Sequence, residues 1–279
     1  MRGNDAGSDP LRRPSAHPQE GCLSRRREPL PTRVEGLPPL PAEYSDVLEA
    51  CLADLRLSLP PDARRAIDDH ARLLLAWTAS INLTAIRNPV DVARLHVADS
   101  LTAVEPLRAR GVKSLVDLGS GGGYHGLPLA VALPADRTLL VDSVGKKAAF
   151  LETVVGATGV AGRVRVAAER GEALAADPRH RERWQAVTSR AVGTVADNVE
   201  LGFPLLRPGG CAVVWKRLPL DGELEAARRA IDALGGGTIE VVRTAVRGLD
   251  DHVLVIATKR GRTAAHYPRD PAERARRPW

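Results

Sequence analysis

The chain of 279 residues is 44% hydrophobic and carries a formal net charge of +6, so it is long enough to bury a sizeable core. No apolar run approaches the length of a membrane span, and the polar, proline-rich start does not match a signal peptide. We therefore expect a cytoplasmic protein without a membrane partner. The three cysteines follow no metal-ligand spacing, so we expect free thiols and no bound metal.

The positive charge is concentrated at the C-terminal end of the chain. Residues 259–279 contain seven basic and two acidic residues, a balance of 7 − 2 = +5. A basic terminus of this kind suits a polyanion such as RNA, and it equally suits a solvated tail without a partner. We therefore expect residues 261–279 to form a basic C-terminal tail.

The first part of the chain is expected to divide into two segments. Residues 1–43 hold eight of the 21 prolines and few periodic apolar residues, which predicts a disordered Pro/Arg-rich extension. Residues 44–110 carry apolar residues at helical spacing, which predicts an N-terminal helical subdomain. Within it, His96 and Asp99 share one helix face. This pair either stabilises the helix surface or faces a substrate cleft, and the residues alone favour the first interpretation.

From Ser114 onward, short apolar strands alternate with helices, which predicts an α/β fold with a doubly wound, mostly parallel sheet over residues 111–260. The loop at 247–250 is too short for a crossover helix, so the last two strands must be antiparallel. We expect seven strands with a reversed last strand, a Rossmann-like arrangement typical of class I S-adenosylmethionine methyltransferases. The predicted strands are 114–117, 138–142, 163–167, 185–189, 211–216, 238–243 and 252–258.

The segment 117–126 is a glycine-rich turn between the first predicted strand and a helix, an architecture that binds nucleotides. Residues 121–126 satisfy the G-x-G-x-x-G pattern of dinucleotide enzymes. Asp117, Gly119 and Gly121 satisfy the acid-x-G-x-G pattern of S-adenosylmethionine enzymes. The acid favours the second class, because its carboxylate could hold the methionine ammonium and would repel a pyrophosphate.

Polar residues also follow the later strands, where the carboxyl ends of parallel strands form a ligand crevice. Asp142 ends the second predicted strand and could accept the ribose hydroxyls of an adenosine. Gly171 and Glu172 follow the third strand and could reach the adenine. Arg190 follows the fourth strand and is expected to point into the crevice.

Several longer motifs make the chain resemble the bacterial small-subunit ribosomal RNA methyltransferase G family, also called glucose-inhibited division protein B. The resemblance covers about residue 47 to the C-terminus. Its motifs are Asn82-Leu83-Thr84, His96-Val97-Ala98-Asp99-Ser100, Val116-Asp117-Leu118-Gly119-Ser120-Gly121, Asp142-Ser143-Val144-Gly145-Lys146, Ser189-Arg190-Ala191 and Tyr267-Pro268-Arg269. One departure is Tyr124-His125, where the family usually has an aromatic residue or leucine followed by proline.

The resemblance implies methylation of guanine N7 in 16S ribosomal RNA, near the decoding centre, with S-adenosylmethionine as cofactor. It implies cofactor contacts from Gly119, Tyr124, Gly171, Glu172 and Arg190. It places substrate-side residues at Asn82, His96, Lys146 and Arg190. The implied partner is 16S ribosomal RNA or an assembling 30S ribosomal particle, and our working expectation is a monomer.

Two other functions are compatible with parts of the sequence. A NAD-dependent Rossmann oxidoreductase would use the glycines of 121–126, but it needs a hydride-transfer acid, and Asp117 is in the wrong place for that role. A non-catalytic RNA-binding scaffold would use the basic C-terminal residues and would bind RNA without methyl transfer.

Overall fold

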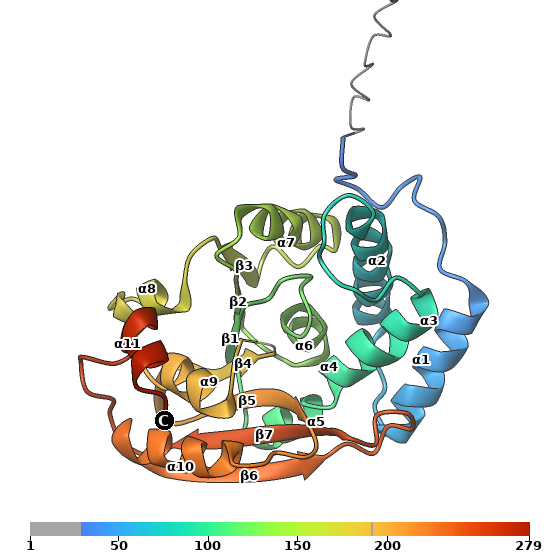
Figure 1. The fold of residues 1–279 in the computed structure, drawn as a ribbon. Helices are drawn as coiled ribbons and strands as arrows, with labels where there is room; N and C mark the ends of the chain where they lie inside the picture. Colours follow the sequence, from blue (N-terminus) through green and yellow to red (C-terminus); the bar gives the residue numbers. More distant parts are fainter. Residues whose placement is uncertain (1–28, 191) are drawn as a thin grey trace, which may run out of the picture.

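The computed structural model describes residues 29–190 and 192–279. Its centre is a single seven-stranded sheet with the strand order β3-β2-β1-β4-β5-β7-β6 (Figure 1). The strands are β1 (Ser114–Leu118), β2 (Arg137–Val141), β3 (Val164–Ala167), β4 (Trp184–Ser189), β5 (Leu206–Arg217), β6 (Gly237–Arg243) and β7 (His252–Lys259).

The strand directions confirm the predicted fold class. The first five strands pair in parallel, whereas β7 is antiparallel to both β5 and β6. All seven strands lie within a few residues of the predicted ranges, although β5 begins five residues earlier than expected. Since β1 is buried along its whole length, the sheet is covered on both faces, as parallel sheets require.

The two faces of the sheet follow from the alternation of side chains along the strands. Leu115 and Leu140 belong to a core shared with the N-terminal helices, whereas Val116 and Leu139 belong to a second core on the opposite face. The first face carries α6 (Gly126–Ala132) and α7 (Gly145–Ala157), and the second carries α8 (Gly171–Ala176), α9 (Val195–Gly202) and α10 (Glu223–Ala233).

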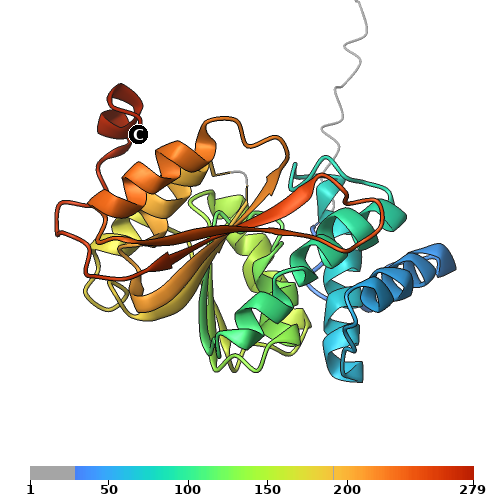
Figure 2. The same cartoon turned by 90° about the horizontal axis from the view of Figure 1, so that it is seen from below.

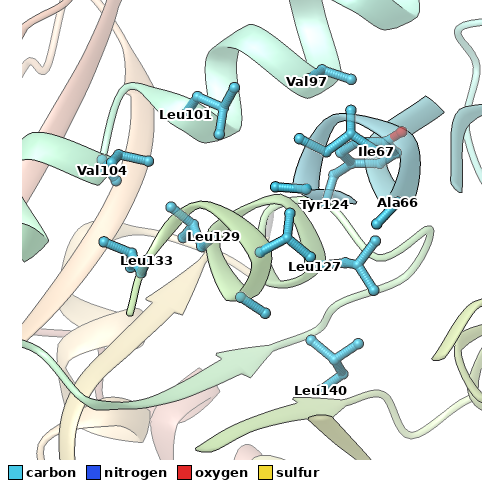
Figure 3. Packing of buried hydrophobic residues seen from close by; sticks show 14 of the residues in the cluster. Ala66, Ile67, Val97, Leu101, Val104, Tyr124, Leu127, Leu129, Leu133 and Leu140 are labelled. Carbon is cyan, nitrogen blue, oxygen red and sulfur yellow. The ribbon is translucent and has the colours of Figure 1, made fainter. Parts of the chain in front are cut away.

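The N-terminal helices share their hydrophobic core with the sheet (Figures 2 and 3). Figure 3 shows Leu127 and Leu129 of α6 between Leu140 of the sheet and the outer helices. The helices are α1 (Ala42–Asp54), α2 (Pro61–Thr78), α3 (Pro89–Asp91), η1 (Val92–Ala98), α4 (Asp99–Leu101) and α5 (Val104–Ala109). The wide-turned π-helix η1 carries His96, and such segments often occur at functional sites.

Part of the segment expected to be disordered is folded in the structure. The expectation of disorder over 1–43 is wrong for residues 29–43, because α1 begins at Ala42 and the preceding segment packs against α2. Val34 is buried, and the carbonyl oxygen of Pro31 accepts a hydrogen bond from Trp77 Nε1 at 2.8 Å. Residues 1–28 lie outside the described part of the chain.

The C-terminal segment, expected to be a basic tail, packs on the sheet domain. Residues 263–279, here named the C-terminal arm, fold back toward α8 and α9 and include the short helix α11 (Pro271–Arg276) (Figure 1). Across the two described ranges, every helix is too short or too polar to cross a bilayer.

Candidate active site

A cavity of about 760 Å³ lies at the carboxyl ends of β1, β2 and β4. The strand order reverses direction at β1, between β2 and β4, and open α/β sheets bind ligands at such switch points. The predicted residues that line the cavity are Gly119, Gly121, Tyr124, Asp142, Gly171, Glu172 and Arg190. The fold therefore brings together side chains from four separate loops, as the strand-end argument predicts.

The glycine-rich turn gives the cavity a backbone wall. Gly119 adopts a φ of +69°, which L-residues rarely accept, and a Cβ there would lie 2.7 Å from the Val192 side chain. Gly126 opens α6 so close to the sheet that a Cβ would lie 2.3 Å from Leu140 Cδ2. The turn therefore needs glycine at position 119 for its backbone conformation and at position 126 for close packing against the sheet.

The structure corrects the predicted role of Asp117. Its side chain is 1% exposed and does not line the cavity. One carboxylate oxygen accepts a hydrogen bond from Thr188 Oγ1 at 2.7 Å, and the other accepts from the backbone N–H of Gly126 at 3.1 Å. Burial raises the pKa of this carboxyl to about 6. Asp117 therefore joins the turn to β4 and α6, and its carboxylate does not face a ligand ammonium.

Asp142 lies where the sequence predicts, at the end of β2 and on the cavity wall. Its two oxygens accept hydrogen bonds from the backbone N–H groups of Gly121 and Val144, each at 2.9 Å. An ionised carboxylate offers about four acceptor positions, so each oxygen retains one for a ligand. Asp142 thus fixes the glycine turn while keeping acceptors available for paired hydroxyls.

Arg190 joins the cavity to two buried residues of the N-terminal helices. Its guanidinium donates to His96 Nδ1 at 2.9 Å and to Asp99 Oδ2 at 3.3 Å, and Asp99 Oδ1 lies 2.9 Å from His252. Since arginine only donates, His96 carries its proton on Nε2 and donates to Thr84 Oγ1 at 2.8 Å. Burial and the Arg190 charge lower the pKa of His96 to about 3, which keeps the ring neutral.

This arrangement differs from both interpretations of the His96–Asp99 pair. Both side chains are buried, so they are not a surface pair, and neither lines the cavity. They meet through Arg190, which does line it. His96 and Asp99 therefore fix the Arg190 guanidinium from the protein interior.

Tyr124 lies within a stack of three rings at the cavity wall. Its ring lies 4.2 Å from that of His70 on one side and 4.8 Å from that of His96 on the other, measured between ring centres. His70 Nε2 donates to the carbonyl oxygen of Gly122 at 2.7 Å. The stack therefore connects helix α2 directly to the glycine turn, a contact that the sequence pattern did not suggest.

Two of the predicted substrate-side residues lie just outside the cavity. Asn82 and Lys146 are exposed and do not line it, whereas their neighbours Leu83 and Lys147 do. The resemblance names Lys146, and the residue after it on α7, Lys147, is the one that lines the cavity. Both predicted residues therefore lie next to the cavity without forming its wall.

Three carboxylates of the sheet domain pair with part of the basic C-terminal segment. Four of the seven basic residues counted from position 259 make ion pairs; these pairs are Lys259–Glu182, Arg262–Glu182, Arg269–Glu200 and Arg274–Glu172. Residues 261–279, expected to form a basic tail, are therefore partly paired with the sheet domain, and the alternative of a solvated tail is wrong. Pro271, Arg274, Ala275 and Pro278 instead line the cavity, which sequence reasoning missed because no local pattern indicates it.

Comparison with known proteins gives sequence matches over most of the chain. The family model of rRNA small subunit methyltransferase G matches residues 63–250. A ribosomal RNA small subunit methyltransferase G of Roseiflexus castenholzii is 39% identical over 223 residues, covering 77% of this chain and 92% of the relative. One of Rubrobacter xylanophilus is 40% identical, covering 76% of this chain and 82% of the relative.

Solved structures align less closely. An O-methyltransferase of Bacillus cereus in complex with SAH has a TM-score of 0.46 at 18% identity, covering 69% of this chain and 91% of that one. A putative O-methyltransferase of Klebsiella pneumoniae has a TM-score of 0.48 at 15% identity, covering 79% and 99%. The family assignment therefore depends on the sequence matches, which extend through the helical region, the glycine turn and the sheet: the chain belongs to the family of ribosomal RNA small subunit methyltransferase G.

Proposed function

We propose that this protein transfers a methyl group from S-adenosylmethionine to N7 of the guanine at the family's position 527 in 16S ribosomal RNA. The observation that supports it best is the cavity at the switch point of the sheet, lined together by Gly119, Asp142 and Arg190. Family membership sets aside both alternatives, the NAD-dependent oxidoreductase and the non-catalytic scaffold.

The residues of the cavity fit an adenosine-containing cofactor. The volume of about 760 Å³ lies within the usual range for small-molecule sites. The free acceptor positions of Asp142 match two ribose hydroxyls, and Gly119 and Gly121 permit close approach of the backbone. Gly171 and Glu172 line the same cavity and offer backbone and carboxylate groups to the adenine.

The chemistry makes modest demands on the protein. The cofactor supplies an electrophilic methyl group on its sulfonium, and guanine N7 has an in-plane lone pair without a proton. No general base is needed, and the buried neutral His96 is consistent with a site that only orients its reactants. The neutral ring and the Asp99 carboxylate hold Arg190 at the cavity, where its charge can contact a phosphate rather than the base.

The substrate side of the site remains our proposal. We assign Asn82 to the edge of the target guanine, because it is exposed next to Leu83 on the cavity wall. Lys146 is exposed at the start of α7 and is suited to the RNA backbone. We also assign Arg190 and His96 to the substrate side. Arg190 contacts the RNA, and His96 holds the Arg190 guanidinium in position through their hydrogen bond. The target base unstacks to enter.

The physiological substrate is 16S ribosomal RNA, either free or within an assembling 30S particle, and the protein acts on it in the cytoplasm as a monomer. A direct test incubates the purified protein with labelled S-adenosylmethionine and either naked 16S RNA or 30S particles that lack the modification. We expect N7-methylguanine at a single position, mapped by chemical cleavage, with one substrate clearly preferred. Methylation at another atom, or no transfer to either substrate, would contradict the proposal.

A variant of Asp142 tests whether the cofactor binds in this cavity, with cofactor affinity measured by titration calorimetry. Asp142→Ala removes the acceptors assigned to the ribose, so we expect weaker S-adenosylmethionine binding with RNA binding retained. Unchanged cofactor affinity in this variant would place the cofactor elsewhere.

A further inference from the structure

The C-terminal arm is fastened to the sheet domain by a buried acidic residue. Glu200 on α9 is fully buried, and within the described residues its side chain accepts hydrogen bonds from the arm alone. Arg269 donates from its backbone and its guanidinium, and Trp279 donates from its ring nitrogen at 2.6 Å. The arm is therefore an integral part of the fold, since without it Glu200 would be a buried carboxylate lacking partners.

A second attachment fixes the start of the arm. The guanidinium of Arg181 donates to the carbonyl oxygens of Thr263, Ala264 and Tyr267, at distances of 2.9 to 3.2 Å. Together with the Glu200 contacts, these bonds hold the chain on both sides of the turn that leads into α11. The helix is thus held at a defined position beside α8.

This placement brings Arg274 of α11 to the cavity wall. Its guanidinium pairs with Glu172, and both side chains are largely buried, with exposed fractions of 13% and 20%. The Nη1 atom of Arg274 is also buried and has no hydrogen-bond partner within residues 29–190 and 192–279. Because Nη1 has no accessible surface, it does not face the cavity, and Arg274 acts on the cavity through its ion pair with Glu172.

We propose that the C-terminal arm forms the wall of the cofactor cavity beside Gly171 and Glu172, and that Arg274 is a positioning residue for the cofactor. Arg274 orients the Glu172 carboxylate so that it accepts a hydrogen bond from the amino group of the adenine. The inference rests on the proposed location of the cofactor in this cavity. It also gives the basic arm a role at the cofactor, in place of the RNA contact that its charge suggests.

The test compares full-length variants. Arg274→Ala removes the ion pair that orients Glu172, and Arg274→Lys keeps the charge but not the forked geometry. Arg276→Ala, two positions along the same helix at an exposed residue, is the matched control. Affinity for S-adenosylhomocysteine is measured by titration calorimetry, and KM for S-adenosylmethionine and kcat are measured with RNA in excess.

We expect Arg274→Ala to weaken binding and raise KM by about tenfold, the loss of one charge-assisted hydrogen bond, with kcat at saturating cofactor unchanged. We expect Arg274→Lys to lie between Arg274→Ala and the wild type, and Arg276→Ala to stay within about twofold of the wild type. A fall in kcat without a change in KM would overturn the inference by showing a purely structural effect.

A comparison with Asp142→Ala separates this inference from the proposed function. If Asp142→Ala loses cofactor affinity while Arg274→Ala retains it, the cavity is the cofactor site but the arm is not its wall. If both variants bind like the wild type, the cofactor lies elsewhere and both proposals fail. Thermal unfolding checks the fold of each variant, and we expect all of them to be folded because none removes the Arg269–Glu200 pair.

Discussion

The proposed cofactor cavity has two walls of different construction. The glycine-turn wall, residues 117–126, takes its shape from glycine conformations such as the φ of +69° at Gly119, and it is anchored both by the bond from the Gly126 N–H to Asp117 and by the more distant bond from Thr188 to Asp117. The arm wall is held by side-chain pairs that are 69 and 102 positions apart, Arg269–Glu200 and Arg274–Glu172. The first wall therefore depends on backbone conformation, and the second on the pairing of distant charges.

The strongest test of this contrast is Arg269→Ala on the arm side. It leaves Glu200 buried with Trp279 as its remaining side-chain partner, and removing one member of a buried ion pair costs about 3 to 5 kcal/mol. We expect the free energy of unfolding in urea to fall by about that amount. The control is Arg277→Ala, at an exposed position of the same arm. An Arg269→Ala variant as stable as the control would show that the arm does not contribute to the fold.

On the glycine-turn side, Gly119→Val tests backbone conformation. The variant requires a φ of +69° from a β-branched residue and places its Cβ 2.7 Å from Val192. We expect affinity for S-adenosylhomocysteine to fall by at least about 100-fold, roughly 2.7 kcal/mol, in titration calorimetry. Gly162→Ala is the control, since its added Cβ meets nothing within 4 Å. Near-normal affinity in Gly119→Val would mean that the turn adapts easily.

The buried Asp117 predicts a pH dependence on the same side. Its folded-state pKa of about 6 is above the ordinary value of 3.8, so its contribution to stability is full below pH 3.8 and is lost as the pH rises through 6. We expect wild type to lose about 2 kcal/mol relative to Asp117→Asn between pH 4 and pH 6. Urea unfolding of both proteins at each pH measures this difference. Parallel pH profiles for the two proteins would contradict the assigned shift.

The smallest expected effect concerns Asn82, which belongs to neither wall. If it contacts the target guanine, Asn82→Ala should lower kcat about tenfold, the loss of one hydrogen bond, and leave KM for S-adenosylmethionine unchanged. Ser80→Ala, at an exposed position just before it, is the control. A raised KM for the cofactor would instead place Asn82 on the cofactor side of the site.

The residues of the cavity differ in how far they could be predicted. Asp142, Gly171 and Arg190 follow strand ends, and parallel strands bring their carboxyl ends to one edge of a sheet, so their convergence follows from the strand pattern. Asp117 lies one residue before the end of β1, and whether its side chain faces the ligand or the protein depends on Thr188 and Gly126, which only packing places beside it. The same applies to Lys146 and Lys147. They are neighbours on one helix, and only the packing of that helix determines that Lys147 lines the cavity.

The amino-acid sequence by itself determined the family, the seven strands with their reversed last member, and the turn at 117–126, because each is encoded in residues close together along the chain. Only the tertiary structure determined which residues the basic C-terminal segment contacts. A run of arginines specifies positive charge but not its partner, and Glu172 and Glu200 reach Arg274 and Arg269 only after α8 and α9 have packed on the sheet. The chemical role of the arm therefore depends on long-range pairing, which no local pattern records.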